Sequence, residues 1–284
     1  MEDKIRQTLS LYKEFDSPVV VFHNRNEIPC NSVPHLHSQV EFCYNITGAG
    51  GMFIDKQLYA CTGHDLFFIP ATCVHKTLVD KEIYYERCII NIDPKLIHEI
   101  NTSSFLHRPL GWMEEESSRK PAKVNLTEDQ HRVFVSLVDR YQLEKDSELK
   151  RFACLMEILD FLSGCFTDPR CFNAELKQPG TLSEQALVEI EKDFRNIRIS
   201  QLSGKLYISS SHLSEQFRQD CGITLGQYLI IRKIAEAKKY LYLGIPVQQA
   251  CELAGFSSYS NFIRTFRKYE GCSPGKLNSL SDPL

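Results

Sequence analysis

The sequence SSSHLSEQFRQDCG at residues 209–222 recurs in outline as SYSNFIRTFRKYEG at residues 258–271, 49 positions later. Each copy opens with serine, carries two large apolar residues one helical turn apart, places an arginine after the second of them, and closes with glycine. Serine favours the position just before a helix, and glycine favours the position just after one. The repeat therefore predicts two equivalent helices with the same order of anchors.

Short amphipathic segments precede both copies, so each unit is predicted to be a helix, a tight turn and a second helix. Between the units, a long helix is predicted from Thr224 to about Leu243, where Gly244 ends it and Pro246 prevents its continuation. At about 1.5 Å per residue this rod measures roughly 30 Å. Successive major-groove faces on one side of DNA lie about 34 Å apart. The rod could therefore hold two reading helices near the spacing of one DNA turn.

Basic charge is concentrated on the repeated units. The whole chain has a formal net charge of −3, but residues 195–276 hold 12 Lys and Arg against 5 Asp and Glu. A local excess of cations matches the footprint of a phosphate backbone, although a charged stretch is more often only a solvated surface.

The last 100 residues or so resemble the DNA-binding domain of AraC/XylS-type transcription regulators. The chain departs from the usual pattern at Leu277, where an aromatic residue is common, and at Glu215, where a basic or amide side chain is common. Glu215 suits a contact to cytosine N4 or, equally, a solvated helix position. The residues that carry the resemblance are Ser209 to Leu213, Phe217, Arg218, Gly222 to Thr224, Tyr228, Arg232, Ala235, Ala237 and Leu241 in the first half, and Val247, Ala250, Ala254 to Ser258, Phe262, Phe266 to Lys268, Gly271, Ser273 and Pro274 in the second.

The resemblance implies that helices Ser210–Asp220 and Tyr259–Tyr269 read DNA. Arg264 suits guanine and Asn261 suits adenine. Arg218, Arg267 and Lys268 are expected to bind phosphates, which position a protein without specifying sequence. The residues that match groove-facing positions are Ser210, Ser211, Ser214 and Glu215 in the first helix, and Tyr259, Ser260, Asn261 and Arg264 in the second.

The N-terminal part of the chain has the pattern of short β-strands. Runs of β-branched and aromatic residues alternate with glycine-containing turns, for example at residues 47–51 and 62–65. Many short strands with such turns predict a sandwich or a small barrel. The expected strands are Val19–Phe22, Val40–Ile46, Met52–Ile54, Leu66–Ile69 and Ile83–Ile92.

From Thr127 the apolar period changes to that of helices. Two helices packed on a barrel would leave an apolar stripe for a second subunit, and the twofold symmetry of many DNA sites favours a homodimer. Alternatively, both apolar faces simply cover the barrel. The expected faces consist of Val133, Leu137 and Tyr141 on the first helix, and of Phe152, Leu155, Leu159 and Leu162 on the second.

A histidine motif marks the barrel region. Alternate residues of a strand share a face, so His35, His37 and Glu41 are expected to point inward together. With Gly48 and the later His75, they resemble the two sequence motifs of cupin barrels. These imidazoles and Tyr44 suit a small polar, sugar-like ligand, which the resemblance also implies.

Two other interpretations of the histidine motif remain open. Three histidines and one carboxylate, His35, His37, Glu41 and His75, suit Fe(II), Mn(II) or Zn(II). The same residues could instead be structural. The sugar-like ligand is our prediction, and no metal or other cofactor is expected.

These features predict a two-domain α+β protein. A cupin-like β-barrel with flanking helices precedes an all-α domain, in which a long linker helix joins two helix-turn-helix units. The expected boundaries are 1–126 for the barrel, 127–166 for the helical pair that forms the dimer, 167–182 for the linker and 183–284 for the DNA-binding domain.

Composition narrows the class of protein. With 43% hydrophobic and 24% charged residues the chain looks globular, and it holds no apolar run of about 20 residues, the length of a membrane span. Eleven cysteines without a CxxC pair indicate reduced core residues of a cytoplasmic protein. Motifs of hydrolases, nucleotide-binding loops and dinucleotide-binding enzymes do not occur, so no enzyme is expected.

We therefore expect a sequence-specific transcription regulator. By resemblance it is an activator that binds promoter DNA as a homodimer, responds to a sugar-like effector and contacts RNA polymerase. Two alternatives stay open: a constitutive DNA-binding regulator with a vestigial barrel, and a metal-dependent cupin enzyme with a DNA-binding tail.

Overall fold

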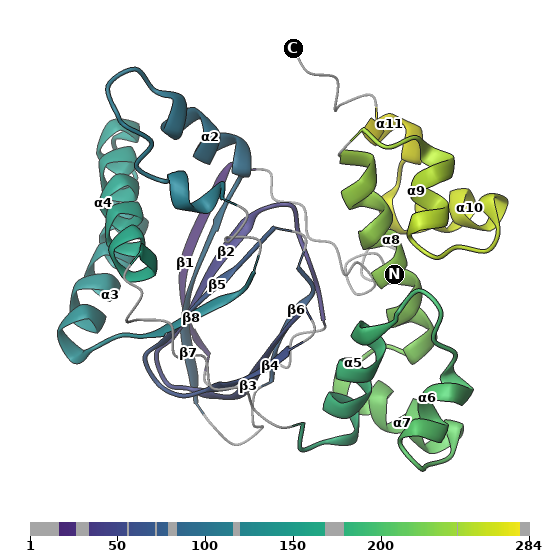
Figure 1. The fold of residues 1–284 in the computed structure, drawn as a ribbon. Coiled ribbons are helices and arrows are strands. Elements are labelled where there is room, and N and C mark those ends of the chain that lie inside the picture. Colours follow the sequence, from purple (N-terminus) through teal and green to yellow (C-terminus); the bar gives the residue numbers. More distant parts are fainter. Residues whose placement is uncertain are drawn as a thin grey trace. The chain divides into compact units, whose positions relative to one another are not determined.

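The computed structural model describes residues 17–26, 34–55, 57–71, 73–78, 84–115, 120–167, 179–242 and 244–278. The chain forms two compact units, one built from the strands and helices α2–α4 and the other from helices α5–α11 (Figure 1). Residues 168–178, which make up most of the expected linker, lie outside the described residues. No helix in the described ranges is long and apolar enough to cross a membrane.

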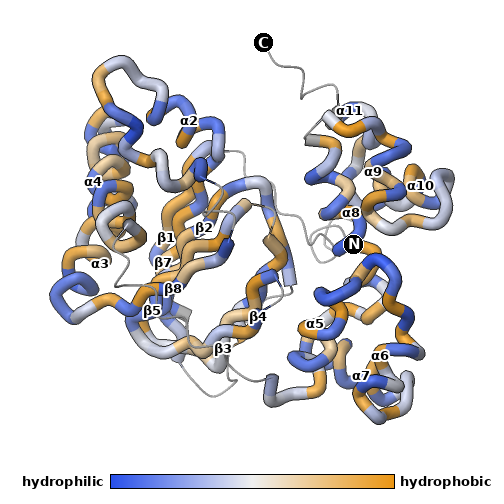
Figure 2. Tube along the Cα trace, in the orientation of Figure 1, coloured by the Kyte–Doolittle hydropathy of each residue, from blue (hydrophilic) through white to orange (hydrophobic). Residues whose placement is uncertain are grey.

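Two antiparallel sheets build the first unit. Figure 2 shows that apolar residues are concentrated along its strands. The larger sheet has the order β1-β7-β2-β5-β8, and the smaller has the order β4-β3-β6. The strands are β1 (Val19–Asn26), β2 (Val40–Asn45), β3 (Ala49–Ile54), β4 (Gln57–Cys61), β5 (Asp65–Ile69), β6 (His75–Leu78), β7 (Tyr85–Ile92) and β8 (Ala122–Asn125).

The inward faces of the two sheets share one apolar cluster. Met52 and Ile54 of β3 and Tyr59 of β4 pack with Cys43 of β2 and Phe67 of β5. Because alternate residues of a strand point to opposite faces, this cluster identifies which residues of each strand lie inside the barrel. Five of the eight strands were predicted. The strands β4, β6 and β8 were missed because they are short and carry polar or charged residues.

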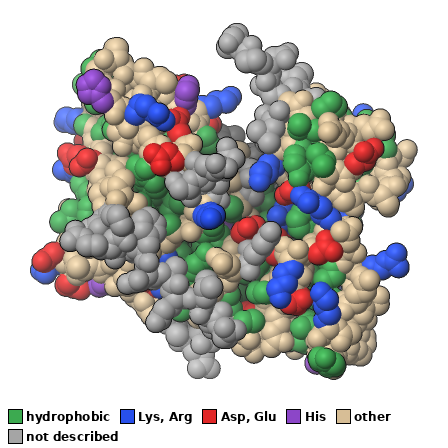
Figure 3. All heavy atoms as spheres, in the orientation of Figure 1, with side chains coloured by type: hydrophobic (Ala, Val, Ile, Leu, Met, Phe, Trp, Pro, Cys, Tyr) green, Lys and Arg blue, Asp and Glu red, His purple; other side chains and the backbone are tan. Residues whose placement is uncertain are grey.

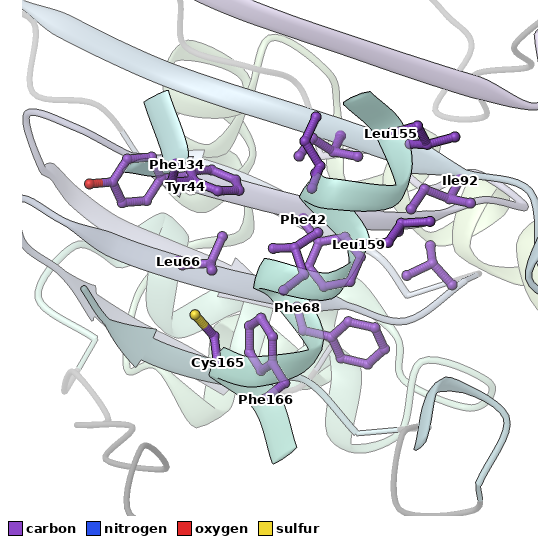
Figure 4. Packing of buried hydrophobic residues seen from close by; sticks show 14 of the residues in the cluster. Phe42, Tyr44, Leu66, Phe68, Ile92, Phe134, Leu155, Leu159, Cys165 and Phe166 are labelled. Carbon is purple, nitrogen blue, oxygen red and sulfur yellow. The ribbon is translucent and has the colours of Figure 1, made fainter. Parts of the chain in front are cut away.

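Three helices and a short 3-10 turn accompany the strands in this unit, with α2 and η1 between β7 and β8, and α3 and α4 after β8. A second apolar cluster joins the outer face of the larger sheet to α3 and α4, where Phe42 and Phe68 meet Phe166, and Tyr44 meets Phe134 (Figure 4). The elements are α2 (Pro94–Thr102), which was not predicted, η1 (Gly111–Met113), α3 (Glu128–Leu143) and α4 (Glu148–Thr167).

The predicted buried face of α3 was partly right. Tyr141 is buried as predicted and Leu137 is half-buried, but Val133 is 51% exposed, and Phe134 and Val138, which were not predicted, are buried. The predicted set of residues, which begins at Val133, and the observed set, which begins at Phe134, both have helical spacing. The sheet covers the observed set, in which the ring of Phe134 packs against Tyr44. On α4 the expected Leu155, Leu159 and Leu162 are buried, but Phe152 is 47% exposed.

The second unit consists of helices alone, and its repeat is visible in its helix ends. Ser209 accepts a hydrogen bond from the backbone N–H of His212 at the start of α7, and Ser258 accepts one from the backbone N–H of Asn261 at the start of α10. Glycines with positive φ end both helices. The helices are α5 (Leu182–Lys192), α6 (Ile199–Lys205), α7 (Ser210–Cys221), α8 (Leu225–Tyr242), α9 (Val247–Leu253), α10 (Tyr259–Glu270) and α11 (Pro274–Asn278).

The anchors of the repeat form the core of this unit. Leu213 and Phe217 of α7, and Phe262 and Phe266 of α10, are all fully buried. The helix α8 has 18 residues, so it is about 27 Å long. The helical unit therefore contains two helix-turn-helix units, α6–α7 and α9–α10, which α8 joins.

Candidate functional site

The surfaces of α7 and α10 present most of the residues expected to contact DNA. Ten of the eleven are exposed, and Ser214 is half-buried. The hydroxyl of Ser214 donates to the carbonyl of Ser210 at 2.7 Å, and the hydroxyl of Ser210 lies 2.8 Å from that of Ser203 on α6. These two serines are therefore partly engaged within the unit. The exposed residues are Ser210, Ser211, Glu215, Arg218, Tyr259, Ser260, Asn261, Arg264, Arg267 and Lys268.

Two of the groove-facing side chains on α10 are connected. Nη2 of Arg264 donates to Oδ1 of Asn261 at 3.1 Å, and the hydroxyl of Thr265 lies 3.4 Å from the same oxygen. Asn261 itself is exposed. The contact holds a guanidinium and an amide side by side, which are the groups that read guanine and adenine.

The cations of this unit fall into two groups. Arg232 and Lys238 are buried and pair with Glu191 and Glu270, so they belong to the core. By contrast, Arg218, Arg267 and Lys268 are exposed and form no ion pair within the described ranges. Figure 3 shows Lys and Arg mixed with Asp and Glu on one face of the helical unit. Part of the basic excess is therefore structural, and the exposed remainder lies on the reading helices.

A buried polar network lies behind the reading helices. The hydroxyl of Tyr228 donates to Oε1 of Glu191 at 2.8 Å, and Nε of Arg232 donates to Oε2 of Glu191 at 2.8 Å. Arg232 also donates to Glu236, which accepts a further bond from Arg195. The sequence analysis singled out Tyr228 and Arg232 through the family pattern, but it missed Glu191, Glu236 and Arg195.

A close backbone contact joins the two halves of the helical unit. Gly255, in the turn between α9 and α10, has a φ of +83°. A Cβ atom added there would lie 2.9 Å from Cα of Arg195, which follows α5. Nζ of Lys233 donates to the carbonyl of Gly255 at 2.8 Å. This turn therefore requires glycine, and it is held both by α8 and by the segment after α5.

The barrel unit holds a second candidate site, formed by His37, Glu41 and His75, whereas His35 is grouped with the helical unit. One possible ligand atom from each of the three residues of the barrel unit lies within 4.8 Å of the others. His37, Glu41 and His75 are buried, and His35 is half-buried. Within the barrel unit, the structure thus brings together three of the four residues that the motif predicted, at the start of β2 and of β6.

Hydrogen bonds orient the buried members of this cluster. Nδ1 of His37 donates to the carbonyl of Gln39 at 2.8 Å, and Nδ1 of His75 donates to the carbonyl of Cys73 at 3.0 Å. Nε2 of His37 lies 2.9 Å, and Nε2 of His75 3.6 Å, from Oε2 of Glu41.

Burial and neighbouring groups shift the pKa values in this cluster in different directions. Burial lowers the pKa of His37, which favours the neutral ring. Burial alone would raise the pKa of Glu41, but the two histidines outweigh it and hold that pKa well below 4.5.

Tyr44 does not belong to this cluster, contrary to the sequence prediction. Its hydroxyl lies 2.7 Å from Nδ1 of His131 on α3, and its ring packs edge-on against Phe134. Tyr44 is three residues from Glu41 on the same strand, so the two side chains point to opposite faces of the sheet. Tyr44 is therefore part of the contact between sheet and helix.

Other polar groups share the inward face with the cluster. Nδ2 of Asn91 donates to Oε2 of Glu41 at 3.0 Å. Oδ1 of Asn91, Nε of Arg87 and Nδ2 of Asn45 are buried atoms that have no hydrogen-bond partner among the described residues. Arg87, Asn91 and Asn45 lie on β7 and β2, at positions that alternate with outward-facing residues. Sequence reasoning missed all three, because polar residues within a strand give no periodic signal of their own.

Comparisons with known proteins identify both units. Residues 30–159 match the family of AraC-like ligand binding domains, and residues 202–279 match a helix-turn-helix domain family. The chain belongs to the AraC family of transcription regulators. This AraC-family protein is a DNA-binding transcription regulator with an N-terminal ligand-binding unit.

Relatives of this AraC-family chain are also described as regulators. It is 23% identical over 264 residues to the uncharacterized HTH-type transcriptional regulator YfiF of Bacillus subtilis, covering 88% of this chain and 80% of that protein. It is 24% identical over 145 residues to the HTH-type transcriptional activator FapR of Escherichia coli, covering 50% of this chain and 55% of that protein. Among solved structures, ToxT from Vibrio cholerae matches with a TM-score of 0.39 and 14% identity, covering 94% of this chain and 99% of that chain.

Proposed function

We propose that this AraC-family regulator activates transcription when a small polar ligand binds on the inward face of its barrel. The observation that carries the proposal is a set of buried polar atoms on the inward face of the larger sheet that have no hydrogen-bond partner among the described residues: Oδ1 of Asn91, Nε of Arg87 and Nδ2 of Asn45. A buried polar group without a hydrogen bond costs about 1–3 kcal/mol, and a ligand that supplies the partner recovers that energy.

The chemistry of these atoms favours a ligand with hydroxyl groups. Asn91 offers an acceptor, whereas Arg87 and Asn45 offer donors. A hydroxyl group both donates and accepts, so a sugar-like molecule can satisfy all three. His37, whose Nε2 lies 3.2 Å from Nδ2 of Asn91, adds a further polar group next to Asn91.

We propose that two chains pair through α3 and α4. Both helices expose large apolar side chains, although the unit buries many others in its core. The outer side of α3 also lines a shallow groove with Val135 and Leu143. In a regulator that binds twofold DNA sites, we expect a second copy of the chain to bury such a surface. The exposed residues are Val133, Leu143, Leu149 and Phe152.

The roles of the parts follow from this assignment. Residues 1–126 are the sensor, 127–166 the dimer element, 167–182 the linker and 183–284 the unit that contacts DNA. We propose activation and not repression because FapR, a relative of similar sequence, is described as an activator. As an activator, the protein would also contact RNA polymerase. The exposed side chains of α7 and α10 supply the contacts to promoter DNA.

Thermal unfolding of the full chain with sugars, sugar acids and phosphates tests the proposal. A ligand that binds only the folded state raises its stability, by about 2.7 kcal/mol at a hundredfold excess over Kd. We expect one class of polyol to raise the Tm, and the shift to disappear in Asn91→Ala. The same ligand should change DNA affinity, because coupling between two sites is reciprocal. A response to no polyol would contradict the proposal and favour constitutive binding.

A further inference from the structure

We propose that Arg87 and Asn45, on the inward face of the barrel, bind an oxyanion of the ligand, either a carboxylate or a phosphate group. The inference rests on the proposed function and narrows its class of ligand from neutral sugars to hydroxy acids or sugar phosphates. The oxyanion subsite, as we call these two residues, combines two unpaired donors that lie side by side with a guanidinium that has no carboxylate partner among the described residues.

The two donors belong to neighbouring strands. Arg87 of β7 lies directly opposite Asn45 of β2, and side chains opposed in this way are about 5 Å apart at Cβ. Nε of Arg87 and Nδ2 of Asn45 are buried, and neither has a hydrogen-bond partner among the described residues. Both atoms only donate, so they cannot satisfy each other. An oxygen of a carboxylate or phosphate is the strongest acceptor for such donors.

The charge of Arg87 lacks a partner as well. Its Nη1 donates to the hydroxyl of Thr77 at 3.3 Å, and its guanidinium lies 5.2 Å from the ring centroid of Tyr85. Within the described ranges, no carboxylate forms an ion pair with it. A charge removed from water is costly unless an opposite charge compensates it. A neutral hydroxyl group would satisfy the hydrogen bond but not the charge, whereas an oxyanion satisfies both.

The position of Arg87 also permits access. The residue is half-buried, whereas the opposed Asn45 is fully buried. Part of the Arg87 side chain is therefore in contact with solvent, while its Nε is not. The hydroxyl of Tyr85 donates to Oδ1 of Asn45, so the amide of Asn45 is held with its other end, Nδ2, unoccupied.

Two neighbours of Arg87 that carry a removable proton stay neutral. Burial raises the pKa of the Tyr85 hydroxyl and of the Cys43 thiol well above their ordinary values. Neither group can therefore supply a negative charge at neutral pH. On β2 the carboxylate of Glu41 accepts from Asn91 instead.

The order of residues along the sheet suits a ligand with one charged end. Three pairs of opposed residues follow one another on the inward face: Asn45 with Arg87, Cys43 with Ile89, and Glu41 with Asn91. The middle pair belongs to the apolar cluster between the sheets, and the third pair contains Oδ1 of Asn91, the acceptor without a partner among the described residues. An oxyanion at the first pair, a carbon face at the second and a hydroxyl group at the third would match this order.

Anion binding to the full-length chain tests the oxyanion subsite. Thermal unfolding is followed in acetate and in inorganic phosphate, with chloride keeping the ionic strength constant. A saturable rise of the Tm in acetate identifies a carboxylate subsite, and a rise in phosphate alone identifies a phosphate subsite. Arg87→Met should raise the Kd of the effective anion by about tenfold or more, the loss expected when a hydrogen bond between charged groups is removed. The matched control is Arg108→Met, whose side chain is exposed and pairs with Glu114.

A second variant supplies the missing charge from within the chain. Asn45→Asp places a carboxylate opposite Arg87 and keeps the oxygen that accepts from Tyr85. It should raise the Tm of the ligand-free chain and remove the response to anions. Circular dichroism verifies that each variant folds.

The outcomes separate the subsite from the proposed function. A wild-type chain that responds to neither anion overturns the subsite, as does an equal response in Arg87→Met and Arg108→Met, or a lower Tm in Asn45→Asp. A neutral polyol that changes DNA affinity in a chain without any anion response leaves the proposed function intact. Anion binding that depends on Arg87, in a chain whose DNA affinity no ligand changes, supports the subsite and contradicts only the proposed function.

Discussion

Nε of Arg232 lies 2.8 Å from Oε2 of Glu191, and both side chains are buried between α8 and α5. The same carboxylate accepts from the hydroxyl of Tyr228, and the same guanidinium reaches Glu236. The helix that joins the two DNA-binding halves is thus held by charged groups that water cannot reach.

Replacing Glu191 with alanine should strongly destabilise the helical unit. The change leaves the Arg232 charge buried with part of its compensation gone, and breaking a buried pair typically costs about 3–5 kcal/mol. Urea unfolding followed by circular dichroism measures the loss. Glu189→Ala on the same helix is the control, because its partners Lys192 and Lys205 are exposed and surface pairs contribute about 1 kcal/mol or less. Equal losses in both variants would contradict the assigned role.

The helical unit should lose stability in acid. Burial would raise the pKa of Glu236, but Arg232 and Arg195 outweigh it and hold the pKa below the ordinary value of 4.5. A carboxylate with a lowered pKa adds stability at pH above about 4.5, and this contribution disappears as the pH falls through the folded-state pKa. Unfolding measured between pH 6 and pH 3 should show a decline that is shallower in Glu236→Gln. An unchanged slope would exclude this residue as a cause.

Gly255→Ala should destabilise the chain more than Gly271→Ala. Both glycines have a positive φ, which costs an alanine about 1 kcal/mol or more. Only at Gly255 would the added Cβ also meet the backbone of Arg195, at 2.9 Å, whereas a Cβ added at Gly271 would have no non-neighbouring atom of the described residues within 4 Å. Thermal unfolding of both variants makes the comparison. A larger effect at Gly271 would show that the turn can move away from Arg195.

Arg264→Ala should weaken binding to the specific DNA site by about 1–3 kcal/mol and leave binding to random DNA almost unchanged. The reason is that Arg264 is exposed on α10 and held beside Asn261. Arg267→Ala should weaken both to a similar extent, as expected of a phosphate contact. Fluorescence anisotropy with a selected site and a scrambled duplex measures both. Equal losses for Arg264→Ala on the two duplexes would argue against base contact.

Phe152→Glu should convert dimers to monomers. Phe152 is 47% exposed on α4 and belongs to the apolar surface assigned to a second copy. A buried carboxylate without a partner opposes association. Sedimentation velocity of the full chain provides the measurement. Phe105→Glu, at an 83% exposed position outside α3 and α4, is the control and should leave the mass unchanged. A wild-type chain that is monomeric at all concentrations would reject this interface.

The helical unit could be predicted in detail because its information is local. Helix caps, anchors one turn apart and terminal glycines lie within 14 residues of one another, and α7 and α10 begin and end within one residue of expectation. The strands and the faces of their side chains were harder to predict from the sequence. The motif located His37 and Glu41, but Tyr44 was assigned to the wrong face because its distance along the strand from Glu41 was not considered.

Contacts between distant residues could not be predicted. Glu191 meets Tyr228 and Arg232 across 37 and 41 positions, and Asn91 meets Glu41 across 50. Nothing in the local pattern of a helix or strand distinguishes these side chains from solvated ones. The prediction of the buried face of α3 was partly wrong for a similar reason. Two sets of apolar residues on α3 have helical spacing, and only packing against the sheet determines which set is buried.

The length of α8 should fix the spacing between the two DNA segments that one chain contacts. One residue inserted into this helix would rotate everything beyond it by about 100° and displace it by about 1.5 Å. The buried pairs along α8 leave little freedom to absorb such a change. We therefore expect the sites of this regulator to tolerate base changes more readily than insertions between the two contacted segments. In related promoters, the number of base pairs separating those segments should vary less than their sequence.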